Sequence, residues 1–280
     1  MMRATATPFT KNISITLGLF YVTGFVIVLF AIGPWEAVRQ FAAEGVILAL
    51  WLWSAHKLLG DALIEVIPIK RPALELGLGL GSFLLLFIGA AGRYLGIKWL
   101  SFFIVVFLLP VVVFVALRYD RRAVGLINAS RRAWLAVLAI VVINIAVGIV
   151  AGQLLPPGEL PTPPGADLAE GIRGPLDVLL ILGQLVLVAA IPEELFFRVY
   201  LQTRLERYLP LGWAIVAQAL LFNAAHFPQH VIRFGYSWPL ALAGLLPITN
   251  GLIGGYLWLR TRSFPLLVVL HLFAYPRFGL

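Results

Sequence analysis

Long apolar segments recur along this chain and constrain its fold more than any other feature. A stretch of about 20 mostly apolar residues is long enough to cross a bilayer as a helix. In lipid, the backbone polar groups must then be bonded within the segment itself. Candidate spans lie near 13–33, 42–59, 73–92, 96–117, 133–155, 176–203, 211–227, 239–259 and 264–276. The sequence therefore predicts an all-α, polytopic transmembrane helical bundle with about eight to nine spans.

Composition agrees with a membrane protein and excludes several other classes. The chain is 61% hydrophobic and 12% charged, whereas a soluble domain is about half apolar and about a quarter charged. It contains no cysteine, which excludes thiol catalysis, disulfides and Cys-ligated metals. The net charge is +8, but the basic residues are grouped in short loops, so we expect no nucleic-acid partner. The first apolar run is too long for a signal-peptide core, so we expect it to be retained.

Charged loops predict the topology. One loop carries five arginines against one acid and should be cytoplasmic: Arg118, Arg121, Arg122, Arg131 and Arg132 against Asp120. Residues 156–177 are rich in Pro and Gly and mostly acidic, so this loop should lie outside. Alternation then predicts a cytoplasmic N-terminus and an extracytoplasmic C-terminus. We divide the chain into N-terminal transmembrane helices (1–155), this loop (156–177) and a C-terminal transmembrane core (178–280).

Three ionisable residues lie together in the predicted span 176–203: Glu193, Glu194 and Arg198. A charge at mid-bilayer costs about 2.5–3.5 kcal/mol on insertion scales. Glu194 and Arg198 are four residues apart and can pair on one helix face. Glu193 points about 100° away and is left to hold and release a proton. The alternative is that the pair only joins helices and that Glu193 bonds a neighbour.

Two histidines, His226 and His271, lie in later apolar spans. With a rise of about 1.5 Å per residue, Glu193 and both histidines lie about 15–22 Å from the basic ends of their spans. We therefore expect the three side chains to meet near mid-bilayer. A lone histidine on an apolar face is nevertheless more often a packing residue than a catalyst.

These motifs resemble those of the CAAX protease and bacteriocin-processing (CPBP) intramembrane proteases. "EELFFR" is similar to the family's Glu-Glu-x-x-x-Arg motif, and "FNAAH" to its Phe-x-x-x-His motif, here Phe222 and His226. "GLIGGYLWLRTRSFPLLVVLH" is similar to its Gly-rich helix, short basic loop and final histidine. The resemblance covers residues 175–275.

The resemblance implies a role for each residue. Glu193 would be the general base that activates water, His226 would position that water, and His271 would stabilise the oxyanion. Glu194, Arg198 and Phe222 would support them. Where the family usually has an asparagine, this chain has Tyr275, whose hydroxyl can also donate a hydrogen bond.

The resemblance also bears on cofactors. We expect none, because the sequence lacks the helical His-Glu-x-x-His signature of zinc proteases. Zinc held by Glu193, His226 and His271 is the alternative, since two histidines and a glutamate form a known zinc ligand set.

The sequence thus predicts an intramembrane endopeptidase that hydrolyses a peptide bond of a membrane-associated substrate. The substrate would be a prenylated CAAX-type tail or an exported peptide, reached within the lipid bilayer. One alternative is a catalytically inactive scaffold of the same fold, favoured only by Tyr275. Another is a proton-coupled transporter, since intramembrane Glu and His are common in proton relays, although repeated halves are not evident.

Overall fold

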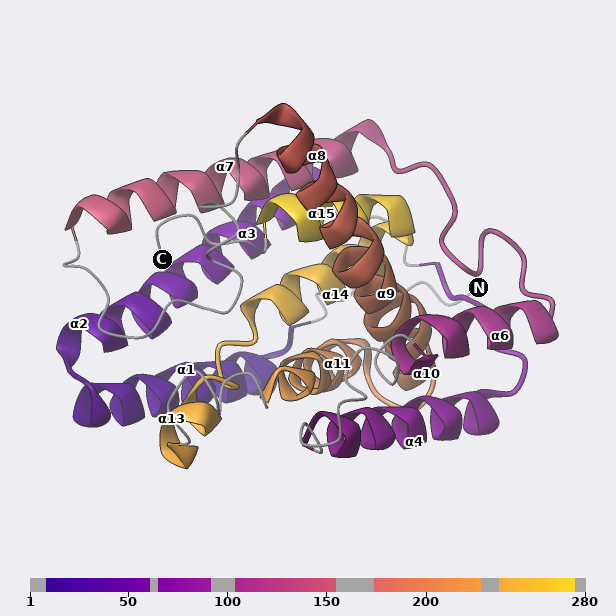
Figure 1. The fold of residues 1–280 in the computed structure, drawn as a ribbon, viewed down its shortest axis with the longest axis horizontal. Coiled ribbons are helices and arrows are strands. Elements are labelled where there is room, and N and C mark those ends of the chain that lie inside the picture. Colours follow the sequence, from indigo (N-terminus) through magenta and orange to yellow (C-terminus); the bar gives the residue numbers. More distant parts are fainter. Residues whose placement is uncertain (1–8, 61–64, 92–103, 155–173, 228–236, 275–280) are drawn as a thin grey trace.

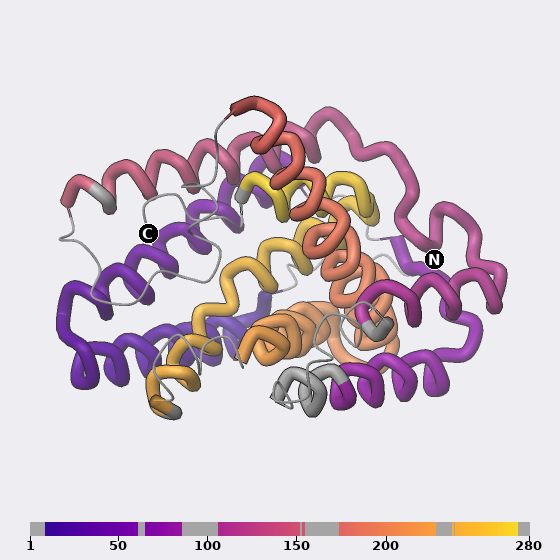
Figure 2. Tube along the Cα trace, in the orientation of Figure 1, coloured from indigo at the N-terminus to yellow at the C-terminus, as the bar shows by residue number. Residues whose placement is uncertain are grey.

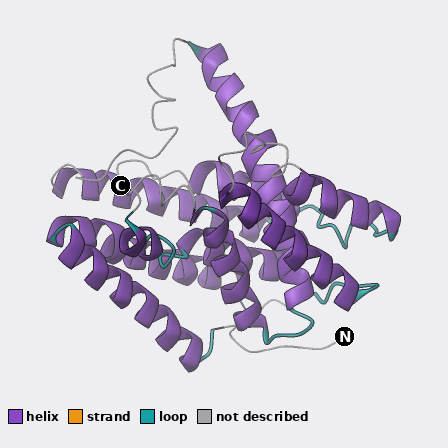
Figure 3. Ribbon diagram, turned by 60° about the horizontal axis from the view of Figure 1, so that its bottom comes forward, coloured by secondary structure: helices purple, strands orange, loops and turns teal. Residues whose placement is uncertain are grey.

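The computed structural model describes residues 9–60, 65–91, 104–154, 174–227 and 237–274. Every regular element in these ranges is a helix, and no strand occurs among them (Figures 1 and 3). Two predictions fall largely or wholly on other residues. Most of the loop 156–177 lies outside the described residues, and so does Tyr275.

In the N-terminal half, the described part of the chain consists of six α-helices and two π-helical turns. The bounds of the α-helices are α1 (Lys11–Ala31), α2 (Pro34–Ala37), α3 (Ala43–Leu59), α4 (Pro72–Ala91), α6 (Leu109–Ala116) and α7 (Arg131–Leu154). A π-helical turn joins α2 to α3. In Figure 1, α3 and α7 run beside each other, and they are in contact along their lengths.

The C-terminal part contains α8 (Pro175–Gln184), α9 (Ile191–Glu193), α10 (Thr203–Leu205), α11 (Leu211–Ala225), α13 (Trp238–Ala243), α14 (Thr249–Thr261) and α15 (Phe264–Ala274). Helices α8, α9 and α10 form one continuous rod, whose intervening turns are π-helical (Figure 2). π-Helical turns inside α-helices occur mostly as short bulges and are frequent at functional sites.

Several described helices have the length and composition of membrane spans. Three are long and apolar enough to cross a bilayer: Lys11–Ala31, Arg131–Ala151 and Pro175–Leu205. Shorter apolar helices add to them: Pro72–Leu85, Val106–Ala116, Leu211–Ala225 and Phe264–Phe273. These helices indicate an integral membrane protein. The count of eight to nine spans stays a prediction.

The predicted span 239–259 is wrong as a single helix. The structure has two, α13 and α14, separated by the segment 244–248. Pro247 accounts for the break, because it has no N–H to donate and its ring clashes with the preceding helical turn. The break places the N-terminal end of α14 within the bundle, where Thr249 is fully buried. Pro192, by contrast, lies inside the continuous rod.

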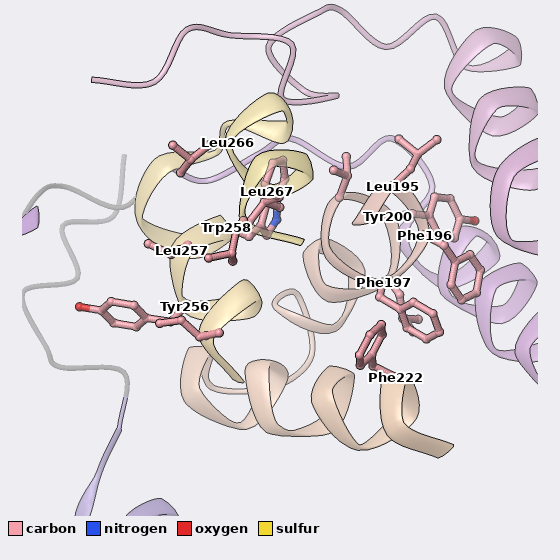
Figure 4. Close-up of a cluster of buried hydrophobic side chains, with 14 of the residues drawn as sticks. Leu195, Phe196, Phe197, Tyr200, Phe222, Tyr256, Leu257, Trp258, Leu266 and Leu267 are labelled. Carbon is pink, nitrogen blue, oxygen red and sulfur yellow. The ribbon is translucent and has the colours of Figure 1, made fainter. Parts of the chain in front are cut away.

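The core is centred on the rod between Glu194 and Gln202, where every residue is buried. Figure 4 shows its aromatic side chains, with the rings of Phe197 and Phe222 against each other; their centroids are 5.2 Å apart. The three polar side chains at positions 194, 198 and 202 repeat every four residues and therefore lie along one helix face. In a bilayer such a face must turn toward protein, which orients the rod.

A buried ion pair fixes the end of the rod near the arginine-rich loop. Arg204 contacts Glu75 of α4 through Nη2 at 2.5 Å and Nε at 3.0 Å from the same carboxylate oxygen. Tyr119 donates to Glu75 at 2.8 Å. Burial raises the pKa of the Tyr119 phenol, so the hydroxyl keeps the proton that this bond requires. Glu75 and Arg204 are both almost fully buried, so their positions are coupled.

Helices α11 and α14 cross closely at Gly251. A Cβ added there would lie 2.6 Å from both Cα and Cβ of Ala219, and small residues allow such close helix packing. We expect Gly251→Ala to lower the free energy of unfolding by about 1–3 kcal/mol through overpacking. Thermal unfolding in detergent would measure this. Gly81→Ala is the control, because a Cβ at Gly81 meets nothing within 4 Å; equal effects of the two variants would contradict the expectation.

Candidate active site

The two adjacent glutamates lie at the junction of α9 with the following π-helical segment. Glu194 is fully buried, whereas Glu193 retains 7% exposure. Adjacent residues on a helix point about 100° apart, so the two carboxylates face different surroundings. The two carboxylates therefore make different contacts.

Glu194 is held by a cation and a histidine. Its Oε2 lies 3.3 Å from Nε of Arg198, and its Oε1 lies 2.8 Å from Nδ1 of His271. The Arg198 guanidinium also lies 4.1 Å from the centroid of the Phe222 ring and donates from Nη2 to the carbonyl of Asn250 at 3.3 Å. Glu194 and Arg198 are completely buried. The pair therefore forms the fixed part of the site.

Glu193 faces two imidazole nitrogens at equal distance. Its Oε1 is 3.9 Å from Nε2 of His226, and its Oε2 is 3.9 Å from Nε2 of His271. These separations are too long for direct hydrogen bonds and suit polar groups bridged by a water molecule. The carboxylate and both rings can thus act on one small molecule between them.

The other ring nitrogens determine how the histidines are protonated. Nδ1 of His226 lies 2.9 Å from the carbonyl of Phe222, which can only accept, so Nδ1 carries a proton. Nδ1 of His271 contacts the Glu194 carboxylate in the same way. In the neutral rings, Nε2 is therefore an acceptor directed at Glu193, and in a protonated ring it becomes a donor.

The structure brings Glu193, His226 and His271 together from α9, the end of α11 and α15. It places Phe222 against Arg198 and also below His226, at 5.0 Å between ring centroids. The sequence did not reveal the contact between Glu194 and His271, which are 77 positions apart. The only sequence signal for this contact was the similar depth in the bilayer predicted for the glutamates and His271.

The spacing of Glu193, His226 and His271 can be compared with that of a zinc site. An imidazole whose second nitrogen is bonded to a carboxylate or carbonyl is typical of zinc ligands, and this donor set is chemically acceptable to zinc. Ligand atoms of a tetrahedral zinc site lie about 3.3 Å apart, given bonds of about 2.0–2.1 Å. The distances of 3.9 Å from Glu193 are wider. Among the described side chains, no group of three or more His, Asp or Glu is arranged to hold a metal ion.

The helices and the polar centre define the class as a helical integral membrane protein with a group of ionisable side chains among its helices. Comparison with known proteins then adds a similarity to one family over part of the chain. Residues 175–275 match a family model described as "Type II CAAX prenyl endopeptidase Rce1-like". This match confirms the resemblance to the CAAX protease family over a segment that contains Glu193, His226 and His271. No curated protein and no solved structure matches the chain.

Proposed function

We propose that this protein is an intramembrane endopeptidase in which Glu193 activates water to hydrolyse a peptide bond. The observation that carries the proposal is the position of Glu193 between two Nε2 atoms, at 3.9 Å from each. The neighbouring Glu194 contacts Arg198 and His271, so the two carboxylates have different roles. One is structural, and the other is placed to exchange a proton.

The proposed reaction uses these side chains in sequence. Glu193 takes a proton from water, and the resulting hydroxide attacks the carbonyl carbon of the substrate. The carbonyl oxygen becomes an oxyanion, which a donor at Nε2 of His271 stabilises. His226 orients the water. Glu193 then delivers the proton to the leaving nitrogen as the C–N bond breaks, so that an acid and an amine are released.

The Glu194 contact suits this role of His271. Because Nδ1 of His271 is bonded to Glu194, donation from Nε2 requires the doubly protonated ring. The Glu194 carboxylate lies between the two cations, Arg198 and the protonated His271 ring, and the oxyanion supplies the second negative charge. Buried charges are tolerated when each has a partner of opposite sign.

The substrate that we propose is a membrane-associated peptide, and the first to test is a prenylated tail of the CAAX type. The matching family is described by that activity, while an exported peptide remains the second choice. Purified protein in nanodiscs would be given matched peptides with and without a farnesyl group, with cleavage followed by mass spectrometry. Cleavage of the farnesylated peptide alone supports the first choice. Intact protein that cuts no peptide of either kind favours an inactive scaffold.

We also propose that the reaction needs no metal. The spacing around Glu193 fits a bridging water better than a tetrahedral zinc ion. We therefore expect a strong chelator to change the cleavage rate less than about twofold, whereas removal of an essential zinc abolishes activity. Loss of cleavage with chelator and recovery with added zinc would show that Glu193, His226 and His271 are ligands instead.

The orientation of the chain in the membrane is part of the same proposal. Exposed arginines in the loop between α6 and α7 favour a cytoplasmic side for that loop. With this loop inside, the N-terminus is cytoplasmic and the C-terminus extracytoplasmic.

A further inference from the structure

A second buried polar group lies at the first turn of α14 and includes residues from the N-terminal half. Thr249, the first residue of α14, donates from Oγ1 to Oε2 of Glu44 at 2.8 Å. The Tyr21 hydroxyl lies 2.5 Å from the same Thr249 oxygen. Since a threonine hydroxyl has one proton, Tyr21 donates to Thr249, and Thr249 donates to Glu44. Thr249 is completely buried, and Glu44 is 9% exposed.

A residue of α11 holds the segment that leads into this turn. Asn223 donates from Nδ2 to the carbonyls of Leu245 and Pro247, at 3.1 Å each. These carbonyls belong to the segment that separates α13 from α14. Asn223 therefore fixes the segment that precedes α14, and the Tyr21–Thr249–Glu44 series fixes the first residue of α14.

This turn contacts the candidate active site directly. Asn250 follows Thr249, and its carbonyl accepts from Nη2 of Arg198 at 3.3 Å. Arg198 pairs with Glu194, and Glu194 contacts His271. A shift of Thr249 moves the Asn250 carbonyl and thus the guanidinium that holds Glu194.

We propose that Glu44 is a positioning residue for the hydrolytic site, acting through Thr249, the Asn250 carbonyl and Arg198. The inference rests on the proposed function. Glu44 and Tyr21 lie outside the matched segment 175–275, so the N-terminal helices complete the site as well as enclosing it. Placing a carboxylate within a bilayer costs free energy, and the hydrogen bond from Thr249 is one contact that stabilises Glu44 there.

The decisive variant is Thr249→Val, which removes the hydroxyl and keeps the shape of the side chain. We expect kcat to fall about tenfold, the scale of one lost buried hydrogen bond, while KM changes less than about twofold. Glu44→Leu should behave in the same way. Glu44→Gln keeps an acceptor for Thr249 and should retain most of the activity.

Thr261→Val is the matched control at the other end of the same helix. Thr261 donates to the carbonyl of Leu257 and accepts from the backbone N–H of Ser263, and it lies outside the series that leads to Arg198. We expect its kcat to equal that of wild type. A similar loss in Thr261→Val and Thr249→Val would mean that α14 is merely destabilised, and the positioning role would be wrong.

A spectroscopic readout separates this inference from the proposed function. In protein labelled with ¹⁵N-histidine, Thr249→Val should shift the Nδ1 resonance of His271, because its Glu194 partner moves, and Thr261→Val should not. If wild type cuts no peptide, the proposed function fails, and the resonance alone decides the positioning role. If wild type is active while Thr249→Val keeps both its kcat and its His271 resonance, the proposed function stands and the positioning role is refuted.

Discussion

Replacement of Glu193 by glutamine is expected to lower kcat/KM for peptide cleavage by about 10²–10⁴-fold, the usual contribution of a general base. Glutamine keeps the size of the side chain but cannot take a proton from water. His226, His271 and the Glu194–Arg198 pair stay in place, because none of them depends on a direct hydrogen bond to Glu193. Mass spectrometry of the peptide products would measure the rate.

Glu36→Gln is the matched control for this variant. Glu36 is also buried, at 6% exposure, and it accepts a hydrogen bond from Gln40 at 2.9 Å, which glutamine can still accept. We expect this variant to cleave at the wild-type rate. Equal cleavage by Glu193→Gln and wild type would remove Glu193 from the mechanism. Equal loss in both variants would point to misfolding rather than chemistry.

Replacement of Arg204 by methionine is expected to lower the free energy of unfolding by about 3–5 kcal/mol, the cost of leaving one buried charge unpaired. Arg204 makes two contacts to one oxygen of Glu75, and its guanidinium lies 4.3 Å from the centroid of the Tyr200 ring. Methionine restores apolar bulk but neither the charge nor the hydrogen bonds. Thermal and denaturant unfolding in detergent would measure the loss.

Two further variants show whether the loss comes from the ion pair. Arg207→Met changes an exposed arginine of the same segment and should be nearly neutral. The double variant Glu75→Leu/Arg204→Met removes both charges, so it should be more stable than Arg204→Met alone. A double variant less stable than the single one would mean that the contribution of Arg204 lies in packing against its aromatic neighbours.

The different roles that we propose for Glu193 and Glu194 come from their surroundings, because the two residues are chemically identical. Glu194 has a cation four residues along the same helix and a histidine from α15. Glu193 has two imidazoles at a distance that leaves room for a small molecule. Burial is complete for the first and incomplete for the second. A pair of carboxylates in different surroundings is a common basis for distinct catalytic roles.

Features that depend on near neighbours in the chain were predictable. The helical class followed from the apolar segments, because a helix is one of the few structures that satisfies its own backbone in lipid. The approach of Arg198 to Glu194 followed from their spacing of four residues. The span 239–259 was expected to be continuous, and the structure divides it at Pro247, which cannot continue a helix.

Features that depend on how the helices are rotated against one another were decided only by the tertiary structure. The contact of His271 with Glu194 and the bond from Thr249 to Glu44 join residues 77 and 205 positions apart. Lipid-facing and core-facing sides of these helices are similarly apolar, so composition cannot tell which side faces inward. Close packing and the pairing of a few buried polar groups decide it. The sequence by itself therefore determined that the helices form and which residues are chemically able to act, and the packing of the bundle decided which of them meet.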